Sequence, residues 1–381
     1  MSVTAQPWLT WCGTALAGVA MVYSLTALLA MRLRRGTAQT GPPMNLPAVT
    51  VLKPLCGAQR GLYGCLRSFC NQLYPHFQLI FGVRDADDPA ISVVRRLQRE
   101  FQGLDLQIAV NPAQHGSSGK VSNLINMMPF ARYDYLVVAD SDVQVAPDYL
   151  AGLIPPLLDP AVGIVTCPYR GRPRRGAWSV LGAAFINDWF MPSVYVAALL
   201  GSRAFAFGVT IAMRREVLAR IGGFTPLADQ LADDYRLGEL TRRLGLRTVL
   251  SEIVVGTAVD ERSLGDLVWH ELRWLRTIRA VRPLGYALSF MTFGLAPAAL
   301  GSLLAAGATP ALAMLAITAV ARLVAHFTAR DARSALLQLW VLPLTDLLGF
   351  ALWCWGFATR RVQWRQTRYR VARDGSAHPL P

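Results

Sequence analysis

Two aspartates follow an apolar run in the segment YLVVADSDVQV, residues 135–145. Asp140 and Asp142 come directly after YLVVA, which is typical of a strand buried on both faces. Side chains two residues apart can point the same way, and neighbouring carboxylates repel each other unless a cation or hydrogen-bond donors neutralise them. A divalent metal bound together with phosphate oxygens does this, because Mg²⁺ and Mn²⁺ favour oxygen ligands. The simpler interpretation is an Asp-Ser-Asp turn.

A second acidic stretch, VRDADDPA at residues 83–90, also follows a strand-like run. Asp88 precedes Pro89, so it is a plausible helix cap, and Pro89 favours a helix start. Capping accounts for one aspartate better than for the three at positions 85, 87 and 88. A carboxylate in this place can instead accept hydrogen bonds from a ribose or a base edge.

A glycine-containing stretch, HGSSGKVSNL at residues 115–124, places Lys120 at a predicted helix start. Gly116 and Gly119 allow close backbone approach, and such a turn can bind a phosphate. The stretch lacks the full GxxxxGK[ST] pattern, so a mobile loop is the alternative interpretation.

A third acidic stretch, LADDYRLGEL at residues 231–240, opens another helical pattern. Asp233 and Asp234 suit the first turn of a helix, where the macrodipole stabilises negative charge. A carboxylate held partly out of water has a raised pKa and can take a proton from an alcohol, so either residue is also a candidate base.

The segment DLVWHELRWLRTIRAVR, residues 266–282, carries arginines every three residues at 273, 276, 279 and 282. An apolar stripe lies roughly opposite, which is typical of a helix on a membrane surface. Membrane adhesion is the simpler interpretation, above all for Arg279 and Arg282. Arg273 and Trp274 lie nearest the predicted soluble domain and can instead face a diphosphate.

Short apolar runs at 48–55, 78–84, 106–110, 135–139 and 163–167 alternate with longer helical patterns. Runs this apolar predict strands of a mostly parallel sheet in an α/β domain, which we place at residues 48–265. Ligands of such sheets collect at the carboxyl ends of the strands, where Asp140 and Asp142 stand.

The composition indicates a membrane protein: 53% of the 381 residues are hydrophobic. Residues 8–30 form an uncharged anchor, and Arg32, Arg34 and Arg35 after it predict that residues 31 onward are cytoplasmic. We expect a linker at 31–47, an amphipathic interfacial helix at 266–283, transmembrane segments within 284–358 and a basic tail at 359–381.

Three candidate spans lie at 284–306, 309–327 and 335–358. Together with the anchor they place the basic tail outside, against the positive-inside tendency. One segment is therefore expected to lie in the interface or to re-enter, and 309–327, which contains Arg322, is the weakest. The net charge of +14 suits an anionic membrane surface or a phosphate-bearing substrate, and no motif supports nucleic acid.

Taken together, these motifs resemble the membrane-bound family 2 and family 21 glycosyltransferases with a GT-A fold, the group that includes ceramide glucosyltransferases. The resemblance covers roughly residues 48–290 and is carried by VTVLKPLCG at 49–57, DDPA, GKVSNL, ADSD, GGF followed by LADDY, and HELRW. Runs such as INDWFMPS and ERSLGDLVWHELRW are most similar to the bacteriohopanetetrol N-acetylglucosaminyltransferases of hopanoid biosynthesis.

The resemblance implies an inverting displacement from a UDP-sugar, with a divalent cation, onto a lipid hydroxyl. The site residues that it implies are Asp142 and Asp140 for the metal, with Asp88, Lys120, Asp140 and His270 for the donor, and Asp234, Arg273 and Trp274 for catalysis. His270 stands where many members carry Gln or Arg. The implied setting is a bacterial-type inner membrane, crossed several times, with the catalytic domain in the cytoplasm.

Three other functions suit parts of the sequence. A ceramide glucosyltransferase that uses UDP-glucose needs the same donor residues. A processive polysaccharide synthase needs more membrane spans than this chain offers. A non-catalytic scaffold that binds anionic lipid accounts for the basic helix but leaves the acidic clusters unexplained.

Overall fold

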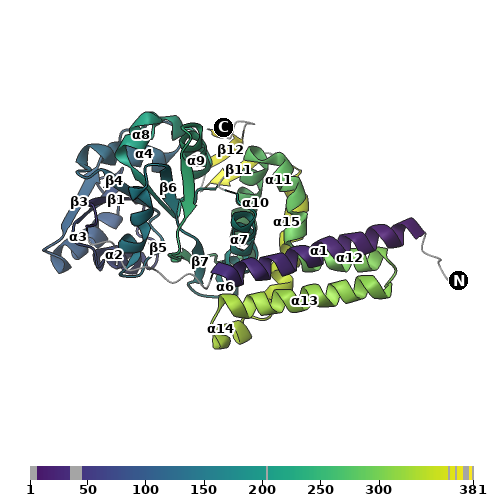
Figure 1. The fold of residues 1–381 in the computed structure, drawn as a ribbon. Coiled ribbons are helices and arrows are strands. Elements are labelled where there is room, and N and C mark those ends of the chain that lie inside the picture. Colours follow the sequence, from purple (N-terminus) through teal and green to yellow (C-terminus); the bar gives the residue numbers. More distant parts are fainter. Residues whose placement is uncertain are drawn as a thin grey trace.

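A computed structural model gives the fold of the chain. Figure 1 shows an α/β domain on one side and a group of long helices on the other. The structure describes residues 7–34, 45–202, 205–358, 361–364, 367–371 and 377–379, the last three ranges by their backbone alone.

Five apolar runs form strands where the sequence predicts them. They are β1 (Val49–Pro54), β2 (Phe77–Val83), β3 (Asp105–Val110), β4 (Tyr135–Ala139) and β6 (Val162–Thr166). Every residue of β1 and β6 is buried, which explains why these runs are apolar without alternation. With β8 (Thr210–Arg214) and β9 (Arg247–Leu250) they build a seven-stranded sheet of order β3-β2-β1-β4-β8-β6-β9.

The sheet is mostly parallel, as predicted, but β8 runs antiparallel to both of its neighbours. The carboxyl ends of β2, β1 and β4 therefore lie along one edge, and the chain enters β8 at that same edge. Ala139, the last residue of β4, pairs with Thr210, the first residue of β8. The residues after β4 and those before β8 are neighbours as a result.

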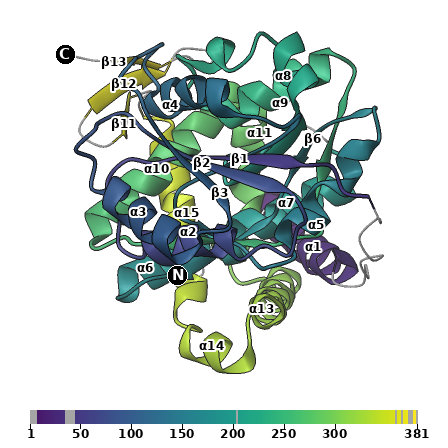
Figure 2. The same cartoon turned by 90° about the vertical axis from the view of Figure 1, so that its left-hand side faces the viewer.

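Helices cover both faces of the sheet. Figure 2 shows α4 (Gly119–Met127), α8 (Arg215–Arg220) and α9 (Asp233–Arg243) above the strands, with α2 (Leu62–Cys70), α3 (Ala90–Glu100) and α5 (Tyr149–Leu153) below them. The buried side chains of the two sets form separate hydrophobic cores with opposite faces of the sheet. Burial on both faces holds the strand ends in fixed positions.

A small second sheet extends the edge at which β4 ends. It has the order β5-β10-β7, from Val143–Gln144, Val255–Val259 and Tyr169–Pro173. Because β5 starts one residue after Asp142 and pairs with Thr257 of β10, this sheet places residues from 258 onward beside the aspartates.

The membrane candidates are α1 (Pro7–Arg34), α13 (Thr309–Ala329) and the segment Gly176–Leu199, which is mostly buried in the protein. A fourth is a pair bent by 76°, Pro283–Thr292 with Leu295–Leu304, if it counts as one span. The sequence made 309–327 the weakest candidate for a continuous span. In the structure the bent segment is instead 283–304, and 309–327 lies within one continuous helix. Arg322 does not break α13 because its side chain is buried and paired within the protein.

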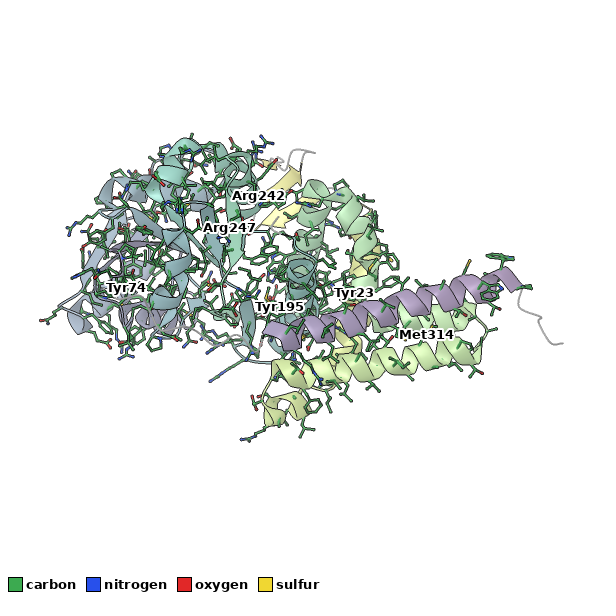
Figure 3. The ribbon with its side chains drawn as sticks, viewed as in Figure 1. Tyr23, Tyr74, Tyr195, Arg242, Arg247 and Met314 are labelled. Carbon is green, nitrogen blue, oxygen red and sulfur yellow. The ribbon has the colours of Figure 1, made fainter. Side chains whose placement is uncertain are left out.

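Close packing joins α1 to its neighbours α12 (Leu295–Leu304) and α13. At Gly13 and Gly301 the two backbones approach so closely that a methyl group on Gly13 would lie 2.4 Å from the Gly301 carbonyl oxygen. Small residues permit such approach between apolar helices. Figure 3 shows Met314 of α13 at the α1 side of that helix, where its sulfur faces Gly18.

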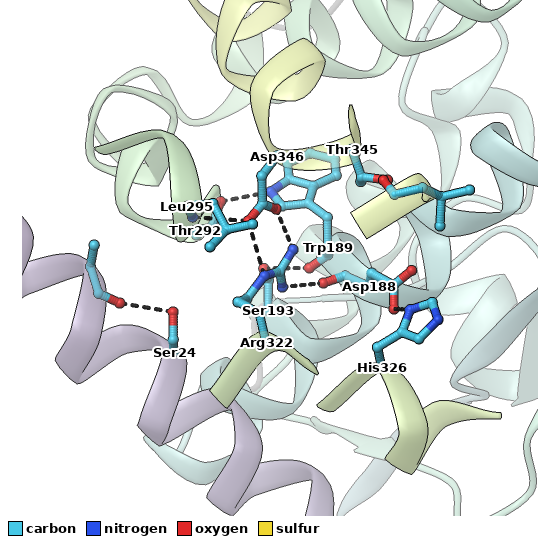
Figure 4. Close-up of polar contacts among 12 residues, drawn as sticks. Ser24, Asp188, Trp189, Ser193, Thr292, Leu295, Arg322, His326, Thr345 and Asp346 are labelled. Atoms are coloured by element: carbon cyan, nitrogen blue, oxygen red, sulfur yellow. Dashed lines mark hydrogen bonds and ion pairs between the residues drawn. The ribbon is translucent and has the colours of Figure 1, made fainter. Parts of the chain in front are cut away.

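A buried ionic cluster ties α13 to the rest of the protein (Figure 4). The Arg322 guanidinium donates to the Asp346 carboxylate of α15 (Val341–Gly356), and Arg330 donates to both oxygens of Asp188 at 2.7 and 2.6 Å. His326 bonds the same Asp188 at 3.1 Å. All five side chains are nearly inaccessible, and such charges persist in an apolar setting only when paired.

Asp188 belongs to a π-helix, Phe185–Phe190, between α6 (Ala177–Ala184) and α7 (Met191–Leu199). Residues 187–190 face four different parts of the protein. Asn187 exchanges two hydrogen bonds with the Gly171 backbone on β7, at 2.9 and 3.0 Å. The side chains of Asp188, Trp189 and Phe190 contact Arg330, Thr292 and Trp274, respectively. This segment therefore links the candidate membrane helices to the α/β domain.

The predicted basic tail contains three short strands, β11 (Arg361–Trp364), β12 (Thr367–Val371) and β13 (Ala377–Pro379). They form an antiparallel sheet of their own. Residues 31–34 of the predicted linker belong to α1, so this helix extends beyond the expected anchor, and residues 35–44 lie outside the described residues.

Candidate active site

The loop that carries Asp140 and Asp142 is fixed at both ends. The amide of Asp140 donates to the Val209 carbonyl at 3.4 Å, and the Asp142 carbonyl accepts from Ala258 at 3.1 Å. The loop thus lies between the start of β8 and the second sheet. Lys53, from the end of β1, donates to the Asp140 carbonyl at 2.6 Å.

The two carboxylates lie in a half-buried, charged setting. Lys120 Nζ lies 2.7 Å from Asp140 Oδ1, and Thr257 donates its hydroxyl to Asp142 Oδ2 at 2.9 Å. Burial raises the pKa of Asp142, and the neighbouring charge of Asp140 raises it further. This is the repulsion that the sequence predicts for two adjacent acids.

These residues fit a divalent cation held jointly with a substrate. Among the described residues no three His, Cys, Asp or Glu side chains are grouped as a metal site. Two aspartates alone suit Mg²⁺ or Mn²⁺ whose remaining ligands are phosphate oxygens and water. A cation would also relieve the repulsion that raises the Asp142 pKa. The site is therefore compatible with the predicted metal, but the protein alone does not supply a complete set of metal ligands.

Lys120 lies in the first turn of α4, whose N-cap, Ser118, accepts the Val121 amide. The side chain contacts Asp140 and also Asp233, at 3.4 Å. Burial alone would lower the Lys120 pKa, but the charges of Asp140 and Asp233 outweigh it, so the pKa is raised. Lys120 is therefore a cation held between acidic side chains at the edge where Asp140 lies.

The loop before α4 does not offer all of its amides to a phosphate. Ser117 N donates to Asp229 Oδ1 at 2.7 Å and Ser118 N to the Ala228 carbonyl at 2.8 Å. These bonds satisfy two donors that a phosphate-binding loop leaves open. The amides of Ser117 and Ser118 are therefore not available to a phosphate.

Asp234 joins the same group from the first turn of α9. One of its oxygens accepts the Gly208 amide at 2.8 Å, and the other accepts the Tyr235 amide at 2.7 Å. Gly208 lies just before β8, so the antiparallel strand brings Asp234 next to Asp140. Burial, followed by the charge of Asp233, raises the Asp234 pKa to about 6.

Arg273 and Trp274 approach the acids from α10 (Leu264–Val281). Burial lowers the Arg273 pKa, while the negative charges of Glu271, Asp140 and Asp234 act in the opposite direction. The Trp274 ring packs edge-on against Phe190, with centroids 5.4 Å apart. The structure therefore brings Asp140, Asp142, Lys120, Asp234 and Arg273 together at one edge of the sheet.

His270, one turn earlier on α10, pairs with a residue that the sequence did not single out. Its Nδ1 lies 2.6 Å from Glu261 Oε1, and its ring lies edge-on to Trp274. The neighbouring Glu271 is buried, and this burial raises its pKa to about 7. His270, Glu261 and Asp142 all line one cavity of about 500 Å³.

Asp88 lies on the same sheet edge but binds the backbone. Both of its oxygens accept the Gly57 amide, at 3.0 and 2.9 Å, and one also accepts the Ala90 amide at 2.8 Å. Asp88 thus accepts the amide of the first residue of α3, but the N-cap of that helix is Pro89 and not, as the sequence suggests, Asp88. The carboxylate also fixes the loop after β1, and its contact with a nucleoside stays a prediction.

Lys53 is the main site residue that sequence reasoning missed. It is fully buried, lies over the Phe69 ring at 3.7 Å and supports the Asp140 backbone. Burial lowers its pKa to about 8, against the charges of Cys65 and the two aspartates. The signal was present, because a lysine inside the apolar run VTVLKP calls for a buried partner.

Two arginines of the α10 stripe donate hydrogen bonds to other parts of the protein. Arg276 is buried, Arg279 donates to the Gly356 carbonyl, and Arg282 donates to the Tyr235 hydroxyl at 3.0 Å. These contacts do not test the expected adhesion of Arg279 and Arg282 to a membrane surface, which stays a prediction; Arg282 itself is exposed. Arg279 satisfies a carbonyl at the C-terminal end of α15, where a cation is favoured.

Comparison with known proteins gives one family and one fold. The model of glycosyl transferase family 21 matches residues 12–377. Ceramide glucosyltransferase 1 of Caenorhabditis elegans is 26% identical over 212 residues, 55% of this chain and 45% of that enzyme. Beta-monoglucosyldiacylglycerol synthase of Trichormus variabilis is 23% identical over 273 residues, 70% of this chain and 56% of that enzyme. The chain thus spans about half the length of these relatives.

The structure is similar to a mannosyltransferase from Pyrobaculum calidifontis that was solved with GDP-Man and Mn²⁺. The TM-score is 0.53 at 21% identity, over 90% of this chain and 98% of that one. At this identity the similarity establishes the fold alone. The α/β domain has the GT-A fold, as the sequence predicts.

Proposed function

The chain belongs to glycosyl transferase family 21, and from this membership we propose that it transfers a sugar from a UDP-sugar to a hydroxyl of a membrane lipid. One observation carries the proposal: carboxylates from separate loops meet Lys120 and Arg273 at one edge of the sheet. Candidate membrane helices pack beside this domain, which suits a lipid acceptor. The names of the relatives, which act on ceramide and diacylglycerol, support the same class of acceptor.

The donor end of the reaction calls for positive charge near a diphosphate. Asp140 and Asp142 would hold a Mg²⁺ or Mn²⁺ ion, which when bound neutralises charge on the leaving UDP. Lys120 and Arg273 are the protein cations placed to bind the diphosphate oxygens. We assign Asp88, through the loop after β1 that it holds, and His270 to the donor side as proposals that rest on the family resemblance.

Asp234 is the proposed general base. The acceptor oxygen attacks the anomeric carbon from the side opposite UDP, the bond from that carbon to the diphosphate oxygen breaks, and the acceptor proton passes to Asp234. The configuration inverts in this single displacement. A pKa of about 6 leaves Asp234 ionised near neutral pH and still basic enough to accept a proton. Trp274 would form a wall of the acceptor site.

For the specific substrates, we propose N-acetylglucosamine from UDP-GlcNAc and bacteriohopanetetrol as acceptor. The support is the similarity of the runs INDWFMPS and ERSLGDLVWHELRW to the enzymes of hopanoid glycosylation. The second candidate is a ceramide glucosyltransferase that uses UDP-glucose, which the name of a relative favours. A non-catalytic scaffold that binds anionic lipid is disfavoured because it leaves the acidic clusters unexplained: acids near an anionic surface only weaken adhesion to it.

For the location, we propose a bacterial inner membrane with the catalytic domain in the cytoplasm. Arg32 and Arg34 at the end of α1 support this orientation through the positive-inside tendency.

Mass spectrometry of host lipids tests the proposed function. A host supplied with bacteriohopanetetrol, ceramide or diacylglycerol is extracted with and without this protein. The expected product is a hopanoid that carries one N-acetylhexosamine. A product found only with ceramide would move the assignment to the second candidate, and no glycolipid with any acceptor would refute the proposed function.

A further inference from the structure

Two neighbouring cavities lie where the C-terminal end of α1 meets the α/β domain. Their volumes are about 130 and 340 Å³, and the residues that we assign to sugar transfer line neither of them. Arg34, Tyr195 and Glu252 line both, so these side chains stand between the two spaces. Figure 3 shows Tyr195 at this junction. We call the two spaces the smaller and the larger junction cavity.

The larger junction cavity continues an apolar surface of α1. Leu25, Leu29 and Leu33 are exposed and recur every four residues, which places them on one face of the helix. Leu33 lines the larger cavity, and so does Leu199, an exposed residue of α7. An acyl chain of a bilayer that lies along this face of α1 therefore leads to the larger cavity.

Both cavities lie at the level where the long apolar helices end. Met31, near the end of α1, packs against Ala325 and Ala329 at the end of α13, and Met31 and Ala329 both line the smaller cavity. Figure 1 shows α1 and α13 side by side. If these helices span a bilayer, their common end is the level of the phospholipid headgroups.

Positive charge predominates around the cavities. Among the described residues that line them, Arg34, Arg170 and Arg247 are basic, and Glu252 alone is acidic. Glu252 Oε1 lies 3.6 Å from Arg34 Nη2, and Arg247 pairs with Asp159 at 2.5 Å. Two of the cations thus have acidic neighbours, but the lining still carries more positive than negative charge. Such a lining favours an anionic group.

Arg34 is held in place at the boundary between the cavities. Its Nη2 atom donates to the carbonyls of Leu250 and Ser251 at 3.3 and 3.0 Å, and its guanidinium lies over the Tyr195 ring at 5.5 Å. A guanidinium can bind two phosphate oxygens with parallel N–H groups. Because the side chain is already oriented, little conformational entropy is lost when a phosphate binds.

We propose that the junction cavities bind an anionic phospholipid of the surrounding bilayer, separate from the lipid that accepts the sugar. Its phosphate binds in the smaller cavity, at Arg34 and Arg170, and its acyl chains lie along Leu33 and Leu199. Basic pockets between membrane helices at the headgroup level bind anionic lipids in this way. The inference depends on the membrane setting of α1 and α13 and not on sugar transfer.

A lipid bound here is expected to stabilise the catalytic domain as well. Arg170 lies on β7, and the next residue, Gly171, pairs with Thr257 of β10. Thr257 in turn donates to Asp142. A ligand held by Arg170 therefore adds a contact to the sheet that supports the proposed metal ligand.

The test measures lipid binding to the full chain in an uncharged detergent, without UDP-sugar. Phosphatidylglycerol and phosphatidylcholine with the same acyl chains are titrated separately, and bound lipid is counted by native mass spectrometry. We expect phosphatidylglycerol to bind about tenfold more tightly or better, the range for charge-assisted hydrogen bonds. Soluble glycerol 3-phosphate is the third arm and should not displace the bound lipid.

Five variants locate the site. Arg34→Gln and Arg170→Gln should each weaken phosphatidylglycerol binding about tenfold. Arg32→Gln is the matched control, because Arg32 is exposed at the same helix end but lines neither cavity; we expect about a twofold change or less. Glu252→Gln removes the acid and should tighten binding. Ala198→Phe keeps every charge but fills the larger cavity, so it should weaken binding.

Thermal unfolding in the same detergent separates binding from folding. Phosphatidylglycerol should raise the unfolding midpoint of the wild-type protein and of Arg32→Gln, because a ligand that binds only the folded state stabilises it. It should not raise the midpoint of Arg34→Gln. If Arg34→Gln does not fold, Arg170→Gln, at an exposed position, and Ala198→Phe carry the test.

Three outcomes would overturn the inference. They are equal binding of the two phospholipids, equal losses in Arg32→Gln and Arg34→Gln, and displacement by glycerol 3-phosphate as effective as that by phosphatidylglycerol. The last would assign the cavities to a soluble phosphate compound. A protein that binds phosphatidylglycerol as expected but transfers no sugar would refute the proposed function and leave this inference intact.

Discussion

The pH dependence of transfer tests the role of Asp234 most sharply. Burial and the charge of Asp233 raise the Asp234 pKa from 3.8 to about 6, so the base should lose its activity well above the range of an ordinary aspartate. At pH 5, about a tenth of the side chains are ionised if the pKa is 6, against about nine-tenths if the pKa is 3.8. The sign follows directly, because only the ionised form accepts the proton, so the rate rises with pH through about 6.

The assay is initial-rate transfer of labelled sugar to lipid between pH 5 and 7.5, with saturating metal. We expect the rate at pH 5 to be on the order of a tenth of the plateau, and Asp234→Asn to lose at least about a hundredfold at every pH. Binding of the UDP-sugar over the same range is the control, because Asp142 also has a raised pKa and acts on the donor side. The fall in rate at acidic pH, which we call the acid limb, should persist in His270→Gln.

A rate that stays flat down to pH 5 would refute this reasoning. So would near-native turnover by Asp234→Asn, because the base would then be another group. If UDP-sugar binding weakens over the same pH range as the transfer rate, the acid limb would be assigned to Asp142 and not to Asp234.

Three further predictions address the metal ligands, the charge balance and the membrane helices. Asp142→Asn should remove the Mn²⁺ dependence of UDP-sugar binding, measured by titration calorimetry; binding that still tightens with Mn²⁺ would exclude Asp142 as a ligand. Lys120→Met removes a cation that lowers the Asp234 pKa, so the acid limb should move upward by on the order of one pH unit; an unmoved limb would contradict the coupling. Asp188→Asn leaves the buried Arg330 without its charge partner and should cost about 3–5 kcal/mol in unfolding measured in detergent. The exposed Asp331→Asn is its control, and equal losses in the two variants would show that burial does not matter.

The sheet was predictable because burial on both faces leaves a direct mark on the sequence. Runs such as VTVLKP and YLVVA are apolar without alternation, and each forms a strand. The antiparallel β8 and the two-residue β5 were not predicted. Their pairing depends on contacts between distant segments, such as Thr257 with Val143, for which a single sequence carries no signal.

The acids of the site were predictable because each follows a strand or opens a helix. Asp140, Asp142 and Asp234 meet as the sheet topology requires. The partner of His270 was not predictable, because Glu261 reaches it from a loop whose packing depends on Gly182 of α6.

The arginine stripe of α10 shows a different limit. A period of three places Arg273, Arg276, Arg279 and Arg282 on one side of a helix, but periodicity does not say what that side meets. In the structure Arg273 feels the charges of nearby acids, Arg279 donates to the end of a helix and Arg282 donates to a tyrosine. Similarly, Arg322 weakens the sequence-based prediction of a membrane span, because its pairing with Asp346 is visible only in the structure.

The central claim is that the carboxylates gathered beside the membrane helices carry out sugar transfer to a lipid. Its most direct test uses purified protein in lipid vesicles that contain bacteriohopanetetrol, with sugar-labelled UDP-GlcNAc and Mn²⁺, and measures label in the lipid fraction. We expect label in the lipid with the wild-type protein and none above background with Asp234→Asn or without metal. Label that enters the lipid equally with Asp234→Asn, or that never enters any lipid while UDP-GlcNAc is bound, would contradict the claim.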